Sequence, residues 1–459
     1  MPRQSHLTAF LLVVCLAFST VTAFAADALT GKVSDAQGKA IAGATVTVQT
    51  GDRSPLASTT SDAQGAFSFA TLPAGNYLVV VTHGAFAEAR MPVTVGGATA
   101  TALNVVLTIA TMRDSATVTA SRDSVEAAGR TGQPVNVIQA AEIADRAKAV
   151  VAQAVEFEPG VQLQRTSPSM AGVFIRGLVG NKVNMYVDGV RYSNGAQRGG
   201  VNTFLDLVDA GGLDSIEVLR GPSSDQYGSD ALGGSIHFFS KTPALSGGGT
   251  RVGGSASVSG GTGHKNGGGS LFGSIAGENF GVTGSLSGRK VGLARPGGGI
   301  DSHAAVTRFF GVASNTIMGE RLPDTGFEQY GGQVRLTYVP NVNTQFTTSY
   351  QRSFQDGAKR YDQLLGGDGN LVSALNGLSL DLFTARLERH AAGPFQELSL
   401  TYGLNRQIEE RVNQGGQGSN TATIGHEPET TTSHSLAASA LRRLGASATV
   451  SVGGDIQFE

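Results

Sequence analysis

The chain has almost no cysteine and no tryptophan. Its one cysteine, Cys15, lies in an apolar run near the N-terminus, and none of the 459 residues is tryptophan. Beyond Cys15 the chain can therefore form neither a disulfide framework nor a cysteine-ligated metal centre. We expect no resident metal ion or cofactor.

Long apolar runs and an excess of charge of either sign are also missing. Beyond the first 25 residues, no stretch reaches the roughly 18 consecutive apolar residues that a membrane-spanning helix needs. The chain has 34 Lys and Arg against 36 Asp and Glu, which leaves a formal charge of −2. This balance gives no reason to expect a nucleic-acid partner.

The N-terminus has the pattern of a secretory leader. Arg3 precedes the apolar run "LTAFLLVVCLAF", and the small residues of "AFA", Ala23 to Ala25, follow at the usual cleavage spacing. We predict a signal peptide over residues 1–25 and hence an exported protein. Val14 is too bulky before Cys15 for a lipoprotein signal, so lipid attachment is not expected.

Glycine is abundant, with 64 residues, and it points to a mainly β chain of strands and turns. The segments "LTGKVSDAQGKAIAGATVTVQT" and "SDAQGAFSFATLPAGNYLVVVTHG" alternate apolar and polar residues around short turns, which predicts a β-sandwich over residues 27–108. These segments resemble a carboxypeptidase regulatory-like domain. The resemblance implies a periplasmic spacer or interaction module, with glycan binding as the alternative.

The stretch "IEVLRGPSSDQYGSDALGGSIHFFSK", Ile216 to Lys241, places a polar glycine-rich loop between two apolar strands. A phosphate cradle would need a lysine and a hydroxyl directly after the last glycine, and this loop has neither. Asp225 and Asp230 would also repel an anion. The stretch therefore predicts a strand, a turn and a second strand, with Pro222 and the glycines making the turn.

Three further motifs precede this stretch in a fixed order. They are "PVNVIQAAEI", "AVEFEPGVQLQRT" and "GVFIRGLVGNKVNMYVDGVRY", and they begin at Pro134. Together the four motifs resemble the plug domain of TonB-dependent outer-membrane receptors. The resemblance implies an α+β plug domain over residues 125–245.

A short polar segment lies between the sandwich and the plug, in a linker over residues 109–124. Such a segment can add a strand to the edge of another protein's sheet, although by itself it also fits a simple linker. The resemblance implies that it is the TonB box, which pairs with a TonB-type energy-transducing protein of the inner membrane. The implied residues are Asp114, Ser115, Ala116, Thr117, Val118, Thr119 and Ala120.

The resemblance also gives roles to residues of the plug. Arg176 in "IRG" and Arg220 in "LRGP" are expected to latch the plug to carboxylates of a surrounding barrel, because a guanidinium fork suits a bidentate acceptor. The alternative is that both make local surface pairs. "VDG" predicts a hairpin turn with a structural rather than a catalytic role. The structural plug residues that we expect are Gly177, Asp188, Gly189, Gly221, Pro222, Tyr227, Gly228, Gly233 and Gly234.

Residues 246–459 have the pattern of a transmembrane β-barrel. Strands of about ten residues alternate apolar and polar side chains, and short turns alternate with long loops, as membrane barrels require. The resemblance places such a barrel in the outer membrane, in contact with its lipid, with the N-terminal domain in the periplasm. The predicted strands are 251–259, 270–276, 280–288, 329–338, 344–354, 379–390, 396–408, 432–441 and 446–458.

Nine strands are too few to enclose a plug of this size, because only barrels near 22 strands hold one. The last residues, "SVGGDIQFE", also stop within a strand pattern. We therefore expect a partial barrel, that is, the N-terminal part of a longer receptor.

The family implies TonB-driven uptake of a scarce, large nutrient, most often a ferric siderophore, haem or cobalamin. The alternatives are a surface carbohydrate-binding or adhesin-like protein and a non-transporting receptor fragment. His264, His303 and His426 lie on predicted outer loops, where a histidine could ligate haem iron, but solvated side chains are the simpler expectation. We find no nucleophile with a base, no pair of carboxylates and no metal set in the sequence, so we do not expect an enzyme.

Overall fold

The computed structural model describes residues 27–35, 38–50, 55–83, 89–96, 101–107, 117–121, 124–127, 134–146, 150–193, 195, 204–243, 245, 250–277, 279–341, 343–414, 419–444 and 448–459. The predicted signal peptide and Asp114 to Ala116 of the predicted TonB box lie outside these residues. The mainly β class is confirmed, since most of the elements are strands.

The N-terminal domain consists of two sheets, with strand orders β4-β1-β7 and β3-β2-β5-β6. Their buried faces share one apolar core, to which Leu29, Val46 and Val79 contribute fully buried side chains. The alternation of apolar residues in the sequence therefore does produce a sandwich. The strands are β1 (Asp27–Asp35), β2 (Thr45–Gln49), β3 (Pro55–Thr60), β4 (Ala66–Leu72), β5 (Gly75–Thr82), β6 (Ala89–Val95) and β7 (Thr101–Leu107).

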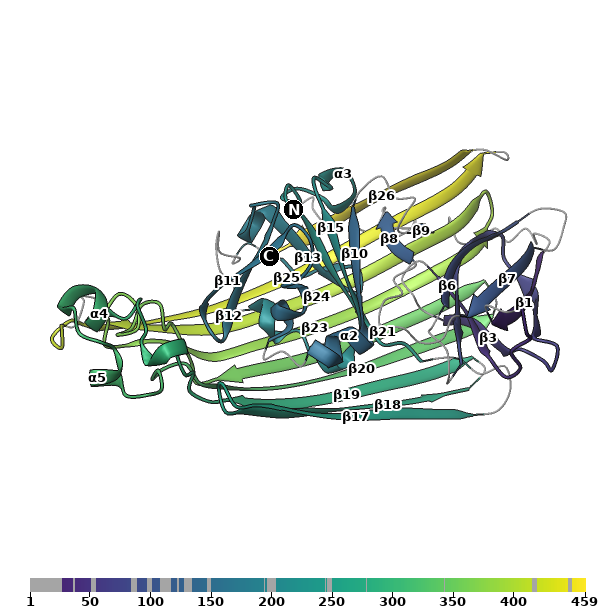
Figure 1. Ribbon diagram of the computed structural model, residues 1–459. Coiled ribbons are helices and arrows are strands. Elements are labelled where there is room, and N and C mark those ends of the chain that lie inside the picture. The colour runs from purple at the N-terminus through teal and green to yellow at the C-terminus, as the bar shows by residue number, and fades with distance from the viewer. Residues whose placement is uncertain are drawn as a thin grey trace, which may run out of the picture.

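A short hairpin follows the sandwich. Strand β8 (Thr117–Ser121) pairs antiparallel with β9 (Ser124–Ala127), and Val118 lies opposite Glu126. The described part of the predicted TonB box is thus already a strand. Figure 1 places this hairpin between the sandwich and the plug.

The plug is built on a five-stranded mixed sheet with the order β10-β15-β16-β13-β14, beside a separate β11–β12 hairpin. Its interior strand β15 is buried along most of its length, as expected of a strand that is covered on both faces. The strands are β10 (Val135–Gln139), β11 (Val161–Ser167), β12 (Met170–Ile175), β13 (Val183–Val187), β14 (Val190–Arg191), β15 (Leu213–Arg220) and β16 (Gly234–Ser240). The helices are α2 (Ala140–Arg146), η2 (Val151–Val155), η3 (Gly180–Lys182), η4 (Phe204–Leu207), η5 (Ala210–Gly212) and α3 (Ser224–Tyr227).

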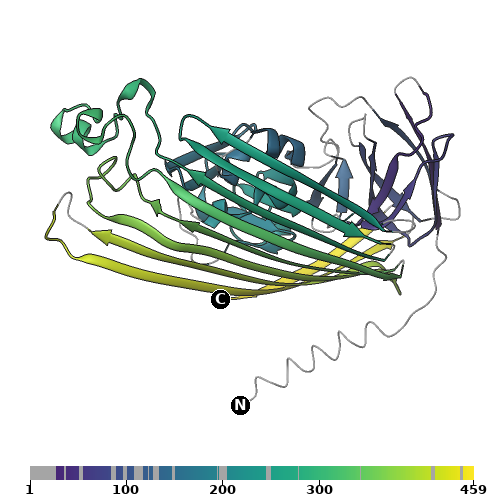
Figure 2. The same ribbon diagram turned by 90° about the horizontal axis from the view of Figure 1, so that it is seen from below.

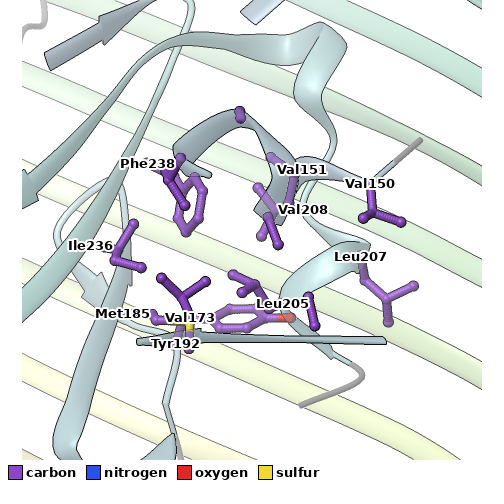
Figure 3. Packing of buried hydrophobic residues seen from close by; sticks show 14 of the residues in the cluster. Val150, Val151, Val173, Met185, Tyr192, Leu205, Leu207, Val208, Ile236 and Phe238 are labelled. Atoms are coloured by element: carbon purple, nitrogen blue, oxygen red, sulfur yellow. The ribbon is translucent and has the colours of Figure 1, made fainter. Parts of the chain in front are cut away.

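The main plug core lies on one face of this sheet. Phe238 and Ile236 of β16 pack toward Val151 of η2 and Val208 after η4, as Figure 3 shows. The same cluster continues into Leu380 of the surrounding sheet, so the plug and that sheet share one apolar core.

The C-terminal half of the chain is an antiparallel sheet, here called the wall, with the order β17-β18-β19-β20-β21-β23-β24-β25-β26 and β22 paired beside β23. All nine predicted strands are present, several of them longer than predicted. With the short β22, which was not predicted, the strands of the wall are β17 (Arg251–Gly261), β18 (Asn266–Ala276), β19 (Phe280–Val291), β20 (Phe327–Asn341), β21 (Thr344–Asp356), β22 (Ala358–Lys359), β23 (Ser373–Ala392), β24 (Phe395–Gln414), β25 (Ile424–Leu444) and β26 (Ala448–Phe458).

Side chains of the wall alternate between its two faces. Along β21, Gln345 and Ser349 are buried on the inner face, whereas Phe346 and Tyr350 are exposed on the outer face. An apolar outside and a polar inside are the arrangement of membrane barrels. The wall curves around the plug (Figures 1 and 2), and β17 and β26 do not pair with each other in the part of the chain that the structure describes.

The two ends of the wall differ, as the loop lengths predict. The sandwich lies at the end with the short turns, and the long connections at the other end carry short helices (Figure 1). These helices are η6 (Gly297–Gly299), α4 (Ala305–Phe310) and α5 (Asn315–Met318). Within the described residues, no helix is both long and apolar enough to cross a membrane.

Candidate functional site

Neutral amide side chains of the wall donate hydrogen bonds to the backbone of the plug. Gln329 Nε2 donates to the Asp206 carbonyl oxygen at 2.7 Å, and Gln351 Nε2 donates to that of Leu207 at 3.3 Å. Strand β24 contributes a further bond, in which Asn405 Nδ2 donates to the Tyr192 carbonyl oxygen at 2.8 Å. Such bonds satisfy plug backbone groups that the plug sheet leaves unpaired.

The plug also buries a carboxyl group that sequence reasoning missed. Asp206 in η4 is fully buried, and its Oδ1 accepts from the Ala152 amide at 3.3 Å. Burial raises the pKa of Asp206 to about 8, although that amide and the charges of Arg289 and Arg165 favour the ionised form. A single acidic residue in "FLDL" gives no signal of this burial in the sequence.

The predicted "VDG" turn is present and does more than connect two strands. Asp188 and Gly189 join β13 to β14 with φ of 49° and 81°. Asp188 Oδ2 lies 3.1 Å from Arg335 Nη1 of β20, and both side chains are almost completely buried. The turn therefore carries an ion pair between the plug and the wall.

The two arginines of the predicted latch lie together on the plug. A Cβ atom on Gly221 would come within 2.8 Å of Arg176 Nη1, so this guanidinium covers Gly221. Arg220 Nη1 donates to the Pro159 carbonyl oxygen at 3.0 Å. Among the described residues neither arginine forms an ion pair, so the latch to a barrel carboxylate stays a prediction.

The glycine-rich stretch from Gly221 to Gly233 covers the second face of the plug sheet. Tyr227 is buried, and its ring packs against His237 with a centroid separation of 4.5 Å. Gly234 follows where only a glycine fits, because a Cβ atom there would lie 2.1 Å from the Leu219 carbonyl oxygen. The other predicted structural residues of this stretch lie in the same loop, with Gly228 at positive φ and Pro222 exposed.

Gly177 and Gly233 complete the predicted structural set. Gly177 follows Arg176, and both have positive φ, which makes the sharp turn after β12. A Cβ atom on Gly233 would lie 2.9 Å from that of Leu178, so this glycine admits the same turn. The loop and the turn after β12 are thus closely packed, and the structural role of these residues stays a prediction.

The described part of the predicted TonB box, Thr117 to Ala120, lies between the sandwich and the plug. Strand β8 runs beside β6 of the sandwich and beside β10 and β15 of the plug. The sandwich itself packs on the wall, where Thr50 Oγ1 donates to Glu388 Oε2 at 3.2 Å. Arg90 of β6 pairs with Asp214 of the plug at 3.0 Å. Nothing in the sequence pattern of the sandwich predicted these contacts.

The outer loops are joined to one another and to the plug. The Ala305 amide of α4 donates to the Leu365 carbonyl oxygen at 2.7 Å, which ties two long loops together. Ser167 Oγ at the tip of the β11–β12 hairpin donates to the Lys359 carbonyl oxygen at 2.7 Å. The tip of this hairpin therefore contacts the end of the wall that carries the long loops.

The three loop histidines do not form a common site. His264 lies in the turn after β17, where burial and the charges of Arg165 and Arg321 lower its pKa. His303 is exposed beside Asp301, and His426 Nδ1 lies 3.0 Å from Glu410 Oε1. Throughout the described residues, no group of three His, Cys, Asp or Glu side chains could hold a metal ion.

Two family models match the chain. The TonB-dependent receptor plug domain matches residues 127–235, and the carboxypeptidase regulatory-like domain matches residues 28–108. Both resemblances inferred from the motifs are thereby confirmed.

Two curated relatives are similar to part of the chain. The vitamin B12 transporter BtuB of Vibrio vulnificus (strain YJ016) is 35% identical over 127 residues, which are 27% of this chain and 20% of that protein. The ferrioxamine B receptor of Salmonella typhimurium (strain SL1344) is 30% identical over 179 residues, which are 36% of this chain and 24% of that protein. These alignments cover only a minor part of each relative.

Solved structures of the same architecture match most of the chain. The copper transporter OprC superposes with a TM-score of 0.56 at 13% identity, over 70% of this chain and 46% of that one. A mutant of the ferric enterobactin receptor PfeA from Pseudomonas aeruginosa superposes with a TM-score of 0.52 at 17% identity, over 72% and 49%. At such low identity these similarities show the fold alone, and the chain spans about half the length of each structure.

Proposed function

Because this chain carries the plug domain of the TonB-dependent receptors, we propose that it acts in the uptake of a scarce, large nutrient across the outer membrane. The observation that carries the proposal is a plug packed within a wall whose strands are polar inside and apolar outside. In a closed barrel, a plug in this position would block the lumen, so passage of a solute would require energy-driven movement of the plug. We assign that energy input to a TonB-type protein of the inner membrane.

The arrangement of the wall supports a location in the outer membrane. Exposed apolar side chains such as Val334, Tyr338 and Phe346 form the outer surface of the wall, as lipid contact requires. Short turns face the periplasm in barrels of this kind. The sandwich lies at that end and is therefore assigned to the periplasm.

We propose a metal chelate or cobalamin as the ligand. The relatives named above are receptors for vitamin B12 and ferrioxamine B. The tip of the β11–β12 hairpin and the joined outer loops provide the surface where such a ligand would bind. Ligation of haem iron is the weaker alternative, because His303 and His426 are exposed and each already lies beside a carboxylate.

Coupling is assigned to the TonB box, of which Thr117 to Ala120 are described as part of β8. A partner strand adds to such a segment through backbone hydrogen bonds, and a proline removes one backbone donor. The variant Val118→Pro is therefore expected to lose uptake of labelled cyanocobalamin or ferrioxamine B while surface binding remains. Val118→Ala keeps the donor and is the matched control, with uptake close to that of the native chain.

Three outcomes contradict parts of the proposal. Unimpaired uptake in Val118→Pro would exclude this segment as the coupling peptide. Uptake of neither probe by the native chain would exclude cobalamin and ferrioxamine B as its ligands. Binding that is lost on deletion of residues 27–108 alone would favour the alternative of a glycan-binding surface protein.

A further inference from the structure

One buried ion pair connects the plug to the wall close to the point where the chain leaves the plug. Asp188 Oδ2 and Arg335 Nη1 are 3.1 Å apart, and their side chains are 7% and 2% exposed. A charge that is buried so deeply is costly unless an opposite charge lies beside it. The docked plug therefore requires these two side chains to lie next to each other.

The carboxylate of Asp188 also holds the end of the plug sheet. Its Oδ1 accepts from the Ser240 amide at 2.9 Å, and its Oδ2 accepts from Ser240 Oγ at 2.7 Å. Ser240 is the last residue of β16, and the chain runs from there into the wall. Asp188 therefore connects the β13–β14 turn to the end of β16 through contacts that lie within the plug.

Strand β20 of the wall makes two contacts with this node. Besides Arg335, it contributes Gln333, whose Nε2 donates to Ser240 Oγ at 2.6 Å. Both residues lie on the inward face of β20, and Arg335 is the only charged residue on that face. The inward positions are Phe327, Gln329, Gly331, Gln333, Arg335, Thr337 and Val339.

Neighbouring contacts bring the same turn close to the wall. Val190 of β14 is almost fully buried, and it packs where Gly403 of β24 has no side chain. A Cβ atom on Gly403 would lie 2.3 Å from Val190 Cγ1. The turn is thus held by a charge pair toward β20 and by close packing toward β24.

We propose that Asp188 and Arg335 form a plug lock, an ion pair that keeps the plug docked on the wall. Its polarity is opposite to that predicted for Arg176 and Arg220, because the carboxylate belongs to the plug and the guanidinium to the wall. Only the purpose of the plug lock rests on the proposed function, because a plug that must move during uptake needs a reversible contact with the wall.

The test uses cysteine labelling of the full chain in membranes. Cys15 is the only native cysteine, so Val190→Cys reports on separation of the plug from the wall. Val218→Cys, in the fully buried centre of β15, reports on unfolding of the plug itself. The rate of reaction with a maleimide is measured for each reporter in each lock variant.

Loss of either charge is expected to undock the plug without unfolding it. Asp188→Asn and Arg335→Gln are each expected to raise labelling at residue 190 by about tenfold and to leave residue 218 protected. Combining the two variants is expected to add little, because they remove the same interaction. Arg335→Lys keeps the charge and is expected to retain most of the protection.

Asp230→Asn is the matched control. Asp230 pairs with Arg191 at 3.2 Å entirely within the plug, so its loss is expected to leave residue 190 protected. Should Asp188→Asn unfold the plug, the comparison of Arg335→Gln with Arg335→Lys still decides, because that residue belongs to the wall.

Unchanged labelling at residue 190 in both Asp188→Asn and Arg335→Gln would overturn the lock. A parallel rise at residues 190 and 218 in Arg335→Gln would overturn it too, since the pair would then serve folding. The labelling experiment needs no ligand. It can therefore support the plug lock even if the uptake experiment contradicts the proposed function.

Discussion

The two faces of the plug sheet are covered in different ways. On the wall side, Ile236 and Phe238 pack under η2 and η4, and the cluster continues into the wall. On the other side, Tyr186, Tyr227 and His237 form an aromatic cluster beneath the loop that carries α3. The first face is covered in part by the wall, which is distant in the sequence. The second face is covered by a loop of the plug itself.

The contacts on the α3 side lie within the plug itself, whereas those on the other side extend to the wall. The α3 side closes on itself, because Asn184 Nδ2 donates to the Tyr227 carbonyl oxygen at 3.0 Å and Tyr186 is held by the same residue. Arg176 and Arg220 belong to this loop region, on local contacts. The wall side contains the plug lock and the buried carboxyl of Asp206, both of which need the wall or its neighbours in place.

The largest effect is expected in the core of the wall side. Phe238 is 1% exposed, and Phe238→Ala is expected to lower the free energy of unfolding by about 3–5 kcal/mol, because it leaves a cavity in the main plug core. The measurement is the urea midpoint of labelling with the Val218→Cys reporter. An unchanged midpoint would mean that this face does not stabilise the plug.

A pH-dependent effect of intermediate size is expected at Asp206. Its folded-state pKa of about 8 lies above the ordinary carboxyl value, so the folded plug binds a proton that the unfolded chain has already released. The stabilisation that comes from protonated Asp206 is fully present below about pH 4. Between about pH 4 and pH 8 the free energy of unfolding falls by up to about 1.4 kcal/mol per pH unit.

Asp206→Asn is expected to remove this slope. The urea midpoint is compared at pH 5 and pH 8 for the native residue and the variant, both with the Val218→Cys reporter. A slope that persists in the variant would assign the pH dependence to other groups.

The smallest effect is expected on the α3 side. Tyr186 donates its hydroxyl to the Tyr227 carbonyl oxygen at 2.5 Å, and Tyr186→Phe is expected to cost about 1 kcal/mol, because one buried hydrogen bond is lost and the ring stays. The same urea assay measures it. A loss as large as that of Phe238→Ala would abolish the distinction between the two faces.

Much of the fold could be predicted from local pattern. Alternating side chains placed all nine wall strands, and the glycine-rich loop after Arg220 was correctly expected to join two strands. The "VDG" turn was also predicted, but the contact of Asp188 with Arg335 was not. These two residues are far apart in the sequence, and neither carries a local signal of its partner.

The candidate site was predicted less completely. The positions of Arg176 and Arg220 follow from the motifs, whereas the burial of Asp206 and the docking of Arg90 on Asp214 do not. A carboxylate in a short apolar motif or an arginine on a strand is typical of a solvated side chain. Only the elements that pack around it determine whether it is buried.

The sequence by itself determined the order of the domains, the alternation of the wall strands and the turns that require glycine, because these depend on neighbouring residues and on backbone sterics. The tertiary structure decided which charges are buried, which strand of the wall meets the Asp188 turn, and how the sandwich packs beside β8. These features depend on long-range packing and on the loss of water around charged groups, which no local pattern encodes.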